Sequence, residues 1–150
     1  MRLRLGSPRE LLAELPWLGA TTLALVATMG LEHFVVHRQI VLPTLALTPH
    51  PPFWMYAAMI VPELVVFFAA GYRLRSGLVI AMYAGVGGLV RSAFHLLLRL
   101  ANEPGHPPGA LDRFTEFAAT TPIVAVGYLL VLVVAAWSGE DERRLAGDDA

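Results

Sequence analysis

Residues 53–98 read FWMYAAMIVPELVVFFAAGY-RLRS-GLVIAMYAGVGGLVRSAFHLLL, two apolar runs joined by a short basic connection. Each run reaches the length of about 20 residues that a helix needs to cross the hydrocarbon core of a bilayer. Two further runs, one before and one after this stretch, have the same character. The sequence therefore predicts an all-α integral membrane protein, a four-helix bundle with spans at about 17–40, 53–72, 77–98 and 117–137.

The composition favours the same class of protein. Of the 150 residues, 56% are hydrophobic and 15% are charged, and the mean hydropathy is +0.59. An average soluble domain carries about 25% charged residues. A soluble core of this size cannot bury so much apolar surface. We expect one polytopic domain over residues 1–150 with the lipid bilayer as its partner.

The charged and sulfur-containing residues exclude several kinds of chemistry. The net charge of -1 leaves no basic surface for nucleic acid. All eleven basic residues are Arg, and the absence of Lys excludes Schiff-base chemistry. The absence of Cys excludes Fe–S clusters, thiolate metal sites and disulfide exchange.

The first residues predict a short interfacial helix ahead of the first span. Ser7 fits the N-cap, Pro8 the first helical position and Glu10 the closing position of a capping box. We expect this helix to end at about Leu15, and Pro16 to bend the chain into the membrane.

The distribution of Arg predicts the orientation, because cytoplasmic loops are enriched in basic residues. Both termini should be cytoplasmic, in a plasma or inner membrane, with residues 139–150 forming a charged, solvated tail. Seven Arg then lie on the cytoplasmic side and three on the other: Arg2, Arg4, Arg9, Arg73, Arg75, Arg143 and Arg144 against Arg38, Arg99 and Arg113.

The two connections on the other side, at 42–52 and 102–109, are rich in proline. We expect both to be non-helical and stiff. Each contains His-Pro-Pro, at His50 and at His106, followed by a similar helix start. This similarity is consistent with duplication of a two-helix hairpin, although short matches in such a chain also arise by chance.

Ionisable residues within the predicted spans mark the candidate site. A charged side chain at the centre of a bilayer costs on the order of 3 kcal/mol, so such residues usually face a bundle interior and are functional. By the predicted depth they keep to the midplane and the outer half. We therefore predict an outward-facing polar pocket built from His33, His37, Glu63, Arg91 and His95.

Two acidic residues are candidates for proton or ion coupling. Glu63 lies almost at the centre of its span, where it can serve as a proton relay, an ion site or a catalytic acid. The alternative is a structural ion pair with Arg91. Glu32 either faces Arg91 from another helix or orients a histidine.

The histidines and Arg91 are the candidate cofactor-binding residues. His33 and His37 are four residues apart, a spacing that can hold a metal ion or flank a haem. Without a third fixed ligand such a pair is more often packing, so His33, His37 and His95 are weak metal candidates. Either of the first two could pair with His95 to ligate haem b, with Arg91 near a propionate, or the same residues could bind a quinone headgroup.

The sequence is compatible with four functions. The leading hypothesis is a cofactor- or quinone-type binding subunit of a membrane complex. The second is a proton-coupled transporter or channel that uses Glu63 and forms a homo-oligomer. The third is a structural accessory subunit without chemistry, packed on other membrane subunits. The fourth is a small enzyme acting on lipids, with Glu63, His95 and Arg91 as acid, base and anion clamp.

Overall fold

The computed structural model describes residues 6–47, 53–102 and 109–145, and these ranges are helical with no strand element. The first helix, α1, is followed without a break by the π-helix η1 and by the short helix α2. The all-α prediction is confirmed. The elements are α1 (Pro8–Leu31), η1 (Glu32–Val41), α2 (Leu42–Leu47), α3 (Phe53–Tyr72), α4 (Gly77–Asn102) and α5 (Ala110–Leu145).

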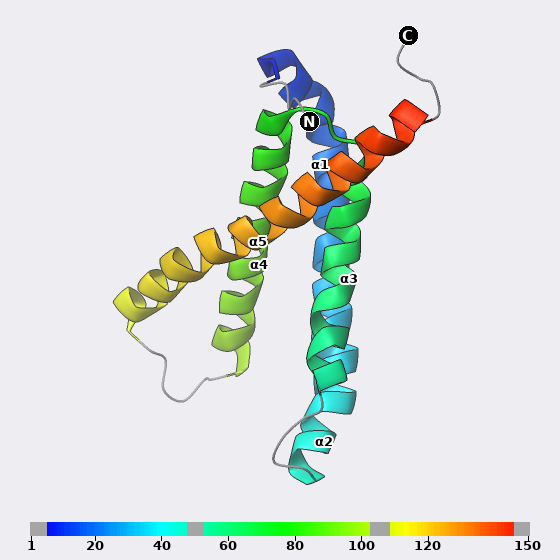
Figure 1. The fold of residues 1–150 in the computed structure, drawn as a ribbon. Helices are drawn as coiled ribbons and strands as arrows, with labels where there is room; N and C mark the ends of the chain where they lie inside the picture. The colour runs from blue at the N-terminus through cyan, green and yellow to red at the C-terminus, as the bar shows by residue number, and fades with distance from the viewer. Residues whose placement is uncertain (1–5, 48–52, 103–108, 146–150) are drawn as a thin grey trace.

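Helices α3 and α4 lie between α1 and α5. Helix α1 packs on both from one side, and α5 packs on both from the other (Figure 1). Helices α1, α3 and α4 run along roughly one direction, whereas α5 crosses them obliquely (Figure 1). The helices therefore surround one interior, but α5 departs from the near-parallel packing typical of a four-helix bundle.

Three helices are long and apolar enough to cross a membrane, namely those at Pro8–Thr44, Gly77–Leu98 and Asp112–Arg143. In α3 the apolar stretch within the described side chains is Ile60–Tyr72, which is shorter. The bounds of α3 nevertheless coincide with the predicted second span. Its membrane-crossing role stays a prediction.

The start of α1 was predicted correctly, but its end at about Leu15 was not. Ser7 caps the helix by accepting a hydrogen bond from the Glu10 amide at 3.4 Å, and Pro8 occupies the first turn. The separate interfacial helix is wrong, because α1 continues through Pro16. Residues on both sides of this proline, Glu14 and Trp17, contact the same arginine, and these shared contacts support the helix where its hydrogen bond is missing.

Two further segments are helical where the sequence predicted otherwise. Residues 42–47 form α2, and Pro43 lies in its first turn, where a missing amide is tolerated. Residues 139–145 continue α5, and Glu142 and Arg143 within them contact Tyr72 of α3, while Asp141, Glu142 and Leu145 are exposed as expected of a solvated segment. The two His-Pro-Pro sequences lie outside the described residues, so the duplication stays a prediction.

The buried apolar side chains all lie toward one end, where α1 begins and α5 ends; we call it the terminal end. On α1 they precede Glu32, on α3 they follow Glu63, on α4 they precede Arg91, and on α5 they start at Tyr128. Beyond these four positions, no apolar side chain in the described part of the chain is buried. The core comprises Leu25, Met29, Phe67, Ala70, Leu74, Val79, Ile80, Tyr83, Ala84, Tyr128, Leu132, Ala135 and Ala136.

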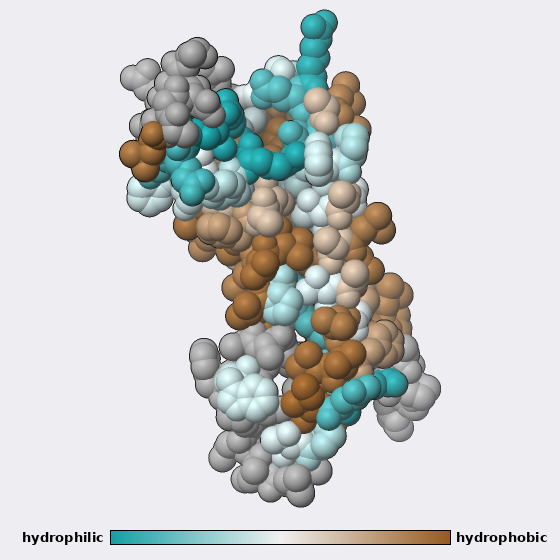
Figure 2. All heavy atoms as spheres, turned by 90° about the vertical axis from the view of Figure 1, so that its right-hand side faces the viewer, coloured by the Kyte–Doolittle hydropathy of each residue, from teal (hydrophilic) through white to brown (hydrophobic). Residues whose placement is uncertain are grey.

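Large apolar side chains are also exposed along the helices. Leu23 is 73% exposed, Ile123 72% and Leu130 63%. Figure 2 shows hydrophobic side chains across the middle of one face and hydrophilic ones gathered at the terminal end. Contiguous exposed apolar surface is unusual for a soluble monomer and marks contact with a membrane or another protein.

Glycines allow α3 and α5 to approach closely. A Cβ atom at Gly71 would lie 2.9 Å from the Cα and carbonyl oxygen of Leu132. A Cβ atom at Gly139 would collide with the carbonyl oxygen of Tyr72. Because these neighbours are backbone atoms, they cannot rotate away.

We predict that Gly139→Ala destabilises the protein by about 1–3 kcal/mol, because the added methyl group overpacks the contact with Tyr72. The control is Gly127→Ala on the same helix, where a Cβ atom meets nothing within 4 Å. That change should be neutral or stabilise the helix by up to about 1 kcal/mol. Denaturant unfolding in detergent micelles measures both, and equal effects would contradict the close approach.

Candidate functional site: a buried charge cluster

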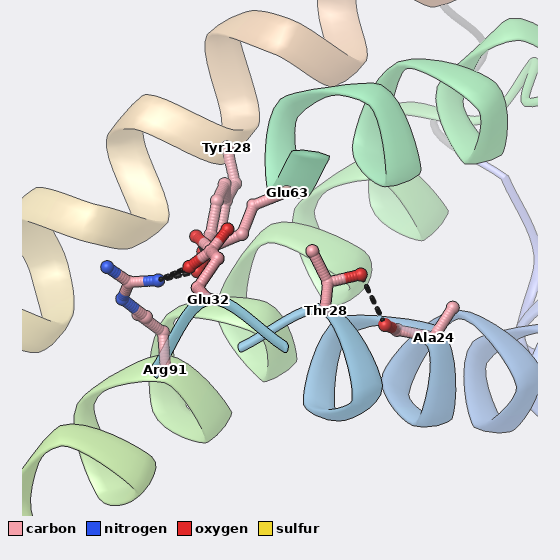
Figure 3. A network of polar contacts seen from close by, with 6 residues as sticks. All are labelled: Ala24, Thr28, Glu32, Glu63, Arg91 and Tyr128. Atoms are coloured by element: carbon pink, nitrogen blue, oxygen red, sulfur yellow. Dashed lines mark hydrogen bonds and ion pairs between the residues drawn. The ribbon is translucent and has the colours of Figure 1, made fainter. Parts of the chain in front are cut away.

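Four polar side chains from four helical elements meet in the interior. Glu32 is the first residue of η1, Glu63 belongs to α3, Arg91 to α4 and Tyr128 to α5. Figure 3 shows the four pointing toward one another. We call them the central cluster.

Arg91 bridges the two carboxylates of this cluster. Its Nη1 atom forms an ion pair with Oε1 of Glu63 and donates a hydrogen bond to Oε2 of Glu32 at 3.4 Å. The hydroxyl of Tyr128 donates a hydrogen bond to Oε2 of Glu63 at 2.6 Å. Oε1 of Glu63 and Oε1 of Glu32 are both buried without a hydrogen-bond partner, but that of Glu63 lies in the ion pair with Arg91.

The cluster is buried but lacks charge balance. Glu32 is 4% exposed and Glu63 3%, while the side chain of Arg91 is 27% exposed. If both carboxylates are ionised, the single guanidinium leaves one negative charge uncompensated. Such a buried charge is costly unless it is paired. The chemistry of this site therefore favours binding of a proton or another cation.

Packing around Tyr128 fixes its hydroxyl on Glu63. The ring stacks on Phe67, with centroids 3.9 Å apart and planes 14° from parallel. Gly87 leaves room for this pair, because a Cβ atom there would collide with the Phe67 ring. A Cβ atom at the next residue, Gly88, would lie 2.8 Å from that of Ala125. Small residues on α4 thus bring α5 and its tyrosine to the cluster.

The π-helix begins at Glu32 itself. It spans ten residues, and a backbone hydrogen bond at its end runs from the Leu42 amide to the His37 carbonyl. π-helical turns are rare and frequently occur at functional sites. The backbone irregularity therefore coincides with the least compensated carboxylate.

The structure places two of the predicted histidines together and the third apart. His33 and His37 stack on η1, with ring centroids 5.7 Å apart and planes 17° from parallel. Both are half-buried, and Nδ1 of His37 is buried without a hydrogen-bond partner. His95 on α4 is exposed, and among the described residues no ring contact or hydrogen bond joins it to the pair.

No group of three or more His, Cys, Asp or Glu residues is placed to hold a metal ion within the described ranges. The metal role of His33, His37 and His95 stays a prediction.

A second polar cluster lies at the terminal end, on the connection between α3 and α4. Arg73 forms an ion pair with Glu14 of α1, and its guanidinium lies over the Trp17 ring at 4.2 Å from the centroid. Tyr83 of α4 donates a hydrogen bond to Oε2 of Glu14 at 3.2 Å. We call Glu14, Trp17, Arg73 and Tyr83 the terminal clasp.

The last turns of α5 hold the same connection from the other side. The hydroxyl of Tyr72 donates a hydrogen bond to Glu142. Nη1 of Arg143 donates to the carbonyl oxygen of Tyr72 at 3.1 Å, satisfying a carbonyl at the end of α3. The helices α1 with η1, α3, α4 and α5 are therefore joined by polar contacts at two places, the central cluster and the terminal end.

Sequence reasoning missed Tyr128, Tyr83 and Glu14. A signal existed for the two tyrosines, because a hydroxyl in an apolar span needs a hydrogen-bond partner. Glu14 was hidden because its segment was interpreted as interfacial. The expectation that the polar residues within the spans keep to the midplane and the outer half stays a prediction.

Searches against protein-family models, curated proteins and solved structures find no match for this chain. The central cluster must therefore be interpreted from its own geometry.

We predict that Tyr128→Phe destabilises the protein by about 1–3 kcal/mol, because it removes a buried hydrogen bond to a charged group. The control is the same change in a Glu63→Gln background, where its effect should be clearly smaller. Unfolding in detergent of the wild type, both single variants and the double variant measures this difference. Additive effects would show that the two residues do not interact.

Proposed function

We propose that this chain is an integral membrane protein with four spans that carries protons through the central cluster, as a proton-coupled transporter or a proton channel. The observation that carries the proposal is the sharing of one guanidinium by two buried carboxylates. Intramembrane carboxylates with a basic partner are typical of proton relays in pumps and transporters.

The membrane location is supported by the three long apolar helices and by the exposed apolar side chains. We place the terminal end in the cytoplasm of a plasma or inner membrane. Support comes from Arg73 and Arg143, which both lie at that end, in keeping with the enrichment of basic residues in cytoplasmic loops.

The charge count supports binding of one proton. With one carboxyl group protonated, the other carboxylate and Arg91 form a neutral pair, which lowers the cost of burial. A movement of Arg91 that compensates both carboxylates more equally would release the proton. Because the cluster draws on four helical elements, a change in their packing alters this balance, and proton binding in turn favours one packing.

The distribution of the core supports access from one side. The buried apolar side chains and the terminal clasp separate the cluster from the terminal end. On the other side no apolar side chain is buried among those whose placement the structure describes, a set that leaves out residues 55–59 of α3. We therefore propose that protons reach the cluster from the extracytoplasmic side in this conformation.

The test is proton flux into vesicles that contain the purified protein, driven by a potassium diffusion potential and followed with a trapped pH-sensitive dye. Flux should be faster with the wild type than in protein-free vesicles, and Glu63→Gln should lower it to the protein-free rate. Glu10→Gln, an exposed residue in the first turn of α1, is the control and should leave flux unchanged. Undiminished flux in Glu63→Gln, or none in the wild type, would contradict the proposal.

A cofactor- or quinone-binding subunit of a membrane complex is the second candidate. It is favoured by one observation, the unpartnered buried Nδ1 of His37 in the stacked histidine pair. Such an atom can bond a quinone headgroup or serve a haem. Haem ligation between this pair and His95 would need a rearrangement, because His95 is exposed.

A reduced-minus-oxidised absorption spectrum of protein purified from its own host tests the haem form of this candidate. If haem b binds at the pair, its band should be lost in His37→Ala and kept in His95→Ala. A featureless spectrum would remove haem.

A further inference from the structure

The two carboxyl groups of the central cluster differ in how their charge is satisfied. Glu63 receives a hydrogen bond from Tyr128 and forms the close ion pair with Arg91, and both contacts stabilise an ionised carboxylate. Glu32 accepts one hydrogen bond, from the same Arg91 atom at 3.4 Å. Its second oxygen has no hydrogen-bond partner, although the residue is only 4% exposed. The uncompensated charge therefore belongs to Glu32.

Every element around Glu32 contributes to this balance. Helix α4 presents Arg91, α3 presents Glu63 and α5 presents Tyr128, whose hydroxyl already donates to Glu63. Its own element supplies His33 and His37. Because the single guanidinium is shared with Glu63, neutralising Glu32 takes a proton or another cation, and we take the proton.

The π-helix carries a histidine about one turn beyond Glu32. Its hydrogen bonds link residues five apart, so Glu32 and His37 lie one turn from each other in η1. Each has a buried polar atom without a partner, Oε1 of the glutamate and Nδ1 of the histidine. An imidazole is suited to pass protons on at neutral pH, and one water molecule can bridge two such groups.

We propose that Glu32 is the group of the central cluster that binds and releases the proton, and that His37 transfers the proton to it. In the loading step the N–H bond of the His37 imidazolium breaks and an O–H bond forms on Glu32, leaving neutral imidazole and a carboxylic acid beside the Glu63–Arg91 pair. The inference rests on the proposed proton-carrying function, and it assigns the proton within that site.

Infrared difference spectroscopy tests this assignment, because a protonated carboxyl group has its own C=O stretching band. The protein is purified in a detergent without carbonyl groups, and spectra are compared between pH 6 and pH 9. Ordinary surface carboxylates do not contribute to this difference, because their pKa lies at about 4 and they are ionised throughout the range. Asp substitutions keep the charge count and act as site labels. We expect Glu32→Asp to shift the band, and Glu63→Asp to leave it in place.

The possible outcomes separate the inference from the function. A band that shifts in Glu63→Asp and not in Glu32→Asp assigns the proton to Glu63 and overturns the inference while the proposed function stands. If the wild type shows no carboxylic acid band, neither glutamate of the cluster binds a proton in this pH range, and the proposed function is contradicted as well. Circular dichroism of each variant verifies folding, and Glu32→Gln, which should abolish the band, replaces Glu32→Asp if the latter does not fold.

The role of His37 is measured by the rate at which the band shifts after transfer into heavy water. His37→Asn should slow this exchange by at least about tenfold, because a positioned group that relays protons commonly contributes this much or more. His95→Asn is the control, since that histidine is exposed on α4, and it should exchange at the wild-type rate. Equal rates in all three proteins would exclude His37 as the route.

Discussion

The structure depends on one guanidinium placed between two buried carboxylates. Arg91 can satisfy Glu63 or Glu32 fully, but not both, because its single charge and the same Nη1 atom serve them. Breaking a buried ion pair by removing one partner is expensive, since it leaves an unpaired charge. Helices α3, α4 and η1 are therefore held in positions where these three groups meet, and α5 adds Tyr128 as a donor to the same site.

Most of the stability comes from a part of the molecule other than the central cluster. A buried ion pair adds little net stability, because desolvation offsets the attraction between its charges. The apolar side chains between the central cluster and the terminal clasp supply most of the burial, with Phe67, Tyr83 and Leu132 each 1% exposed or less. The central cluster lies at the edge of this core, where Glu32 and Glu63 are shielded from solvent.

The sequence predicted those features that follow from local pattern. The bounds of α3 and the start of α4 follow from the basic connection between two apolar runs. The Glu63–Arg91 contact was one of two alternatives, since both residues had to face the interior. The continuous α1 and the helical end of α5 depend on contacts with Tyr72 and Arg73, which are distant in sequence. The π-helix and the choice of Tyr128 as donor depend on helix rotation, which apolar periodicity does not determine.

The two polar clusters share their helices, and this constrains how the protein can move. Helix α4 carries both Tyr83 and Arg91. Helix α3 carries Glu63 and ends directly before Arg73. A helix transmits displacement along its axis because its backbone hydrogen bonds keep it rigid. A displacement of α4 along its axis would therefore act both on Arg91 and on the hydrogen bond from Tyr83 to Glu14. The terminal clasp and the central cluster thus both depend on the position of α4.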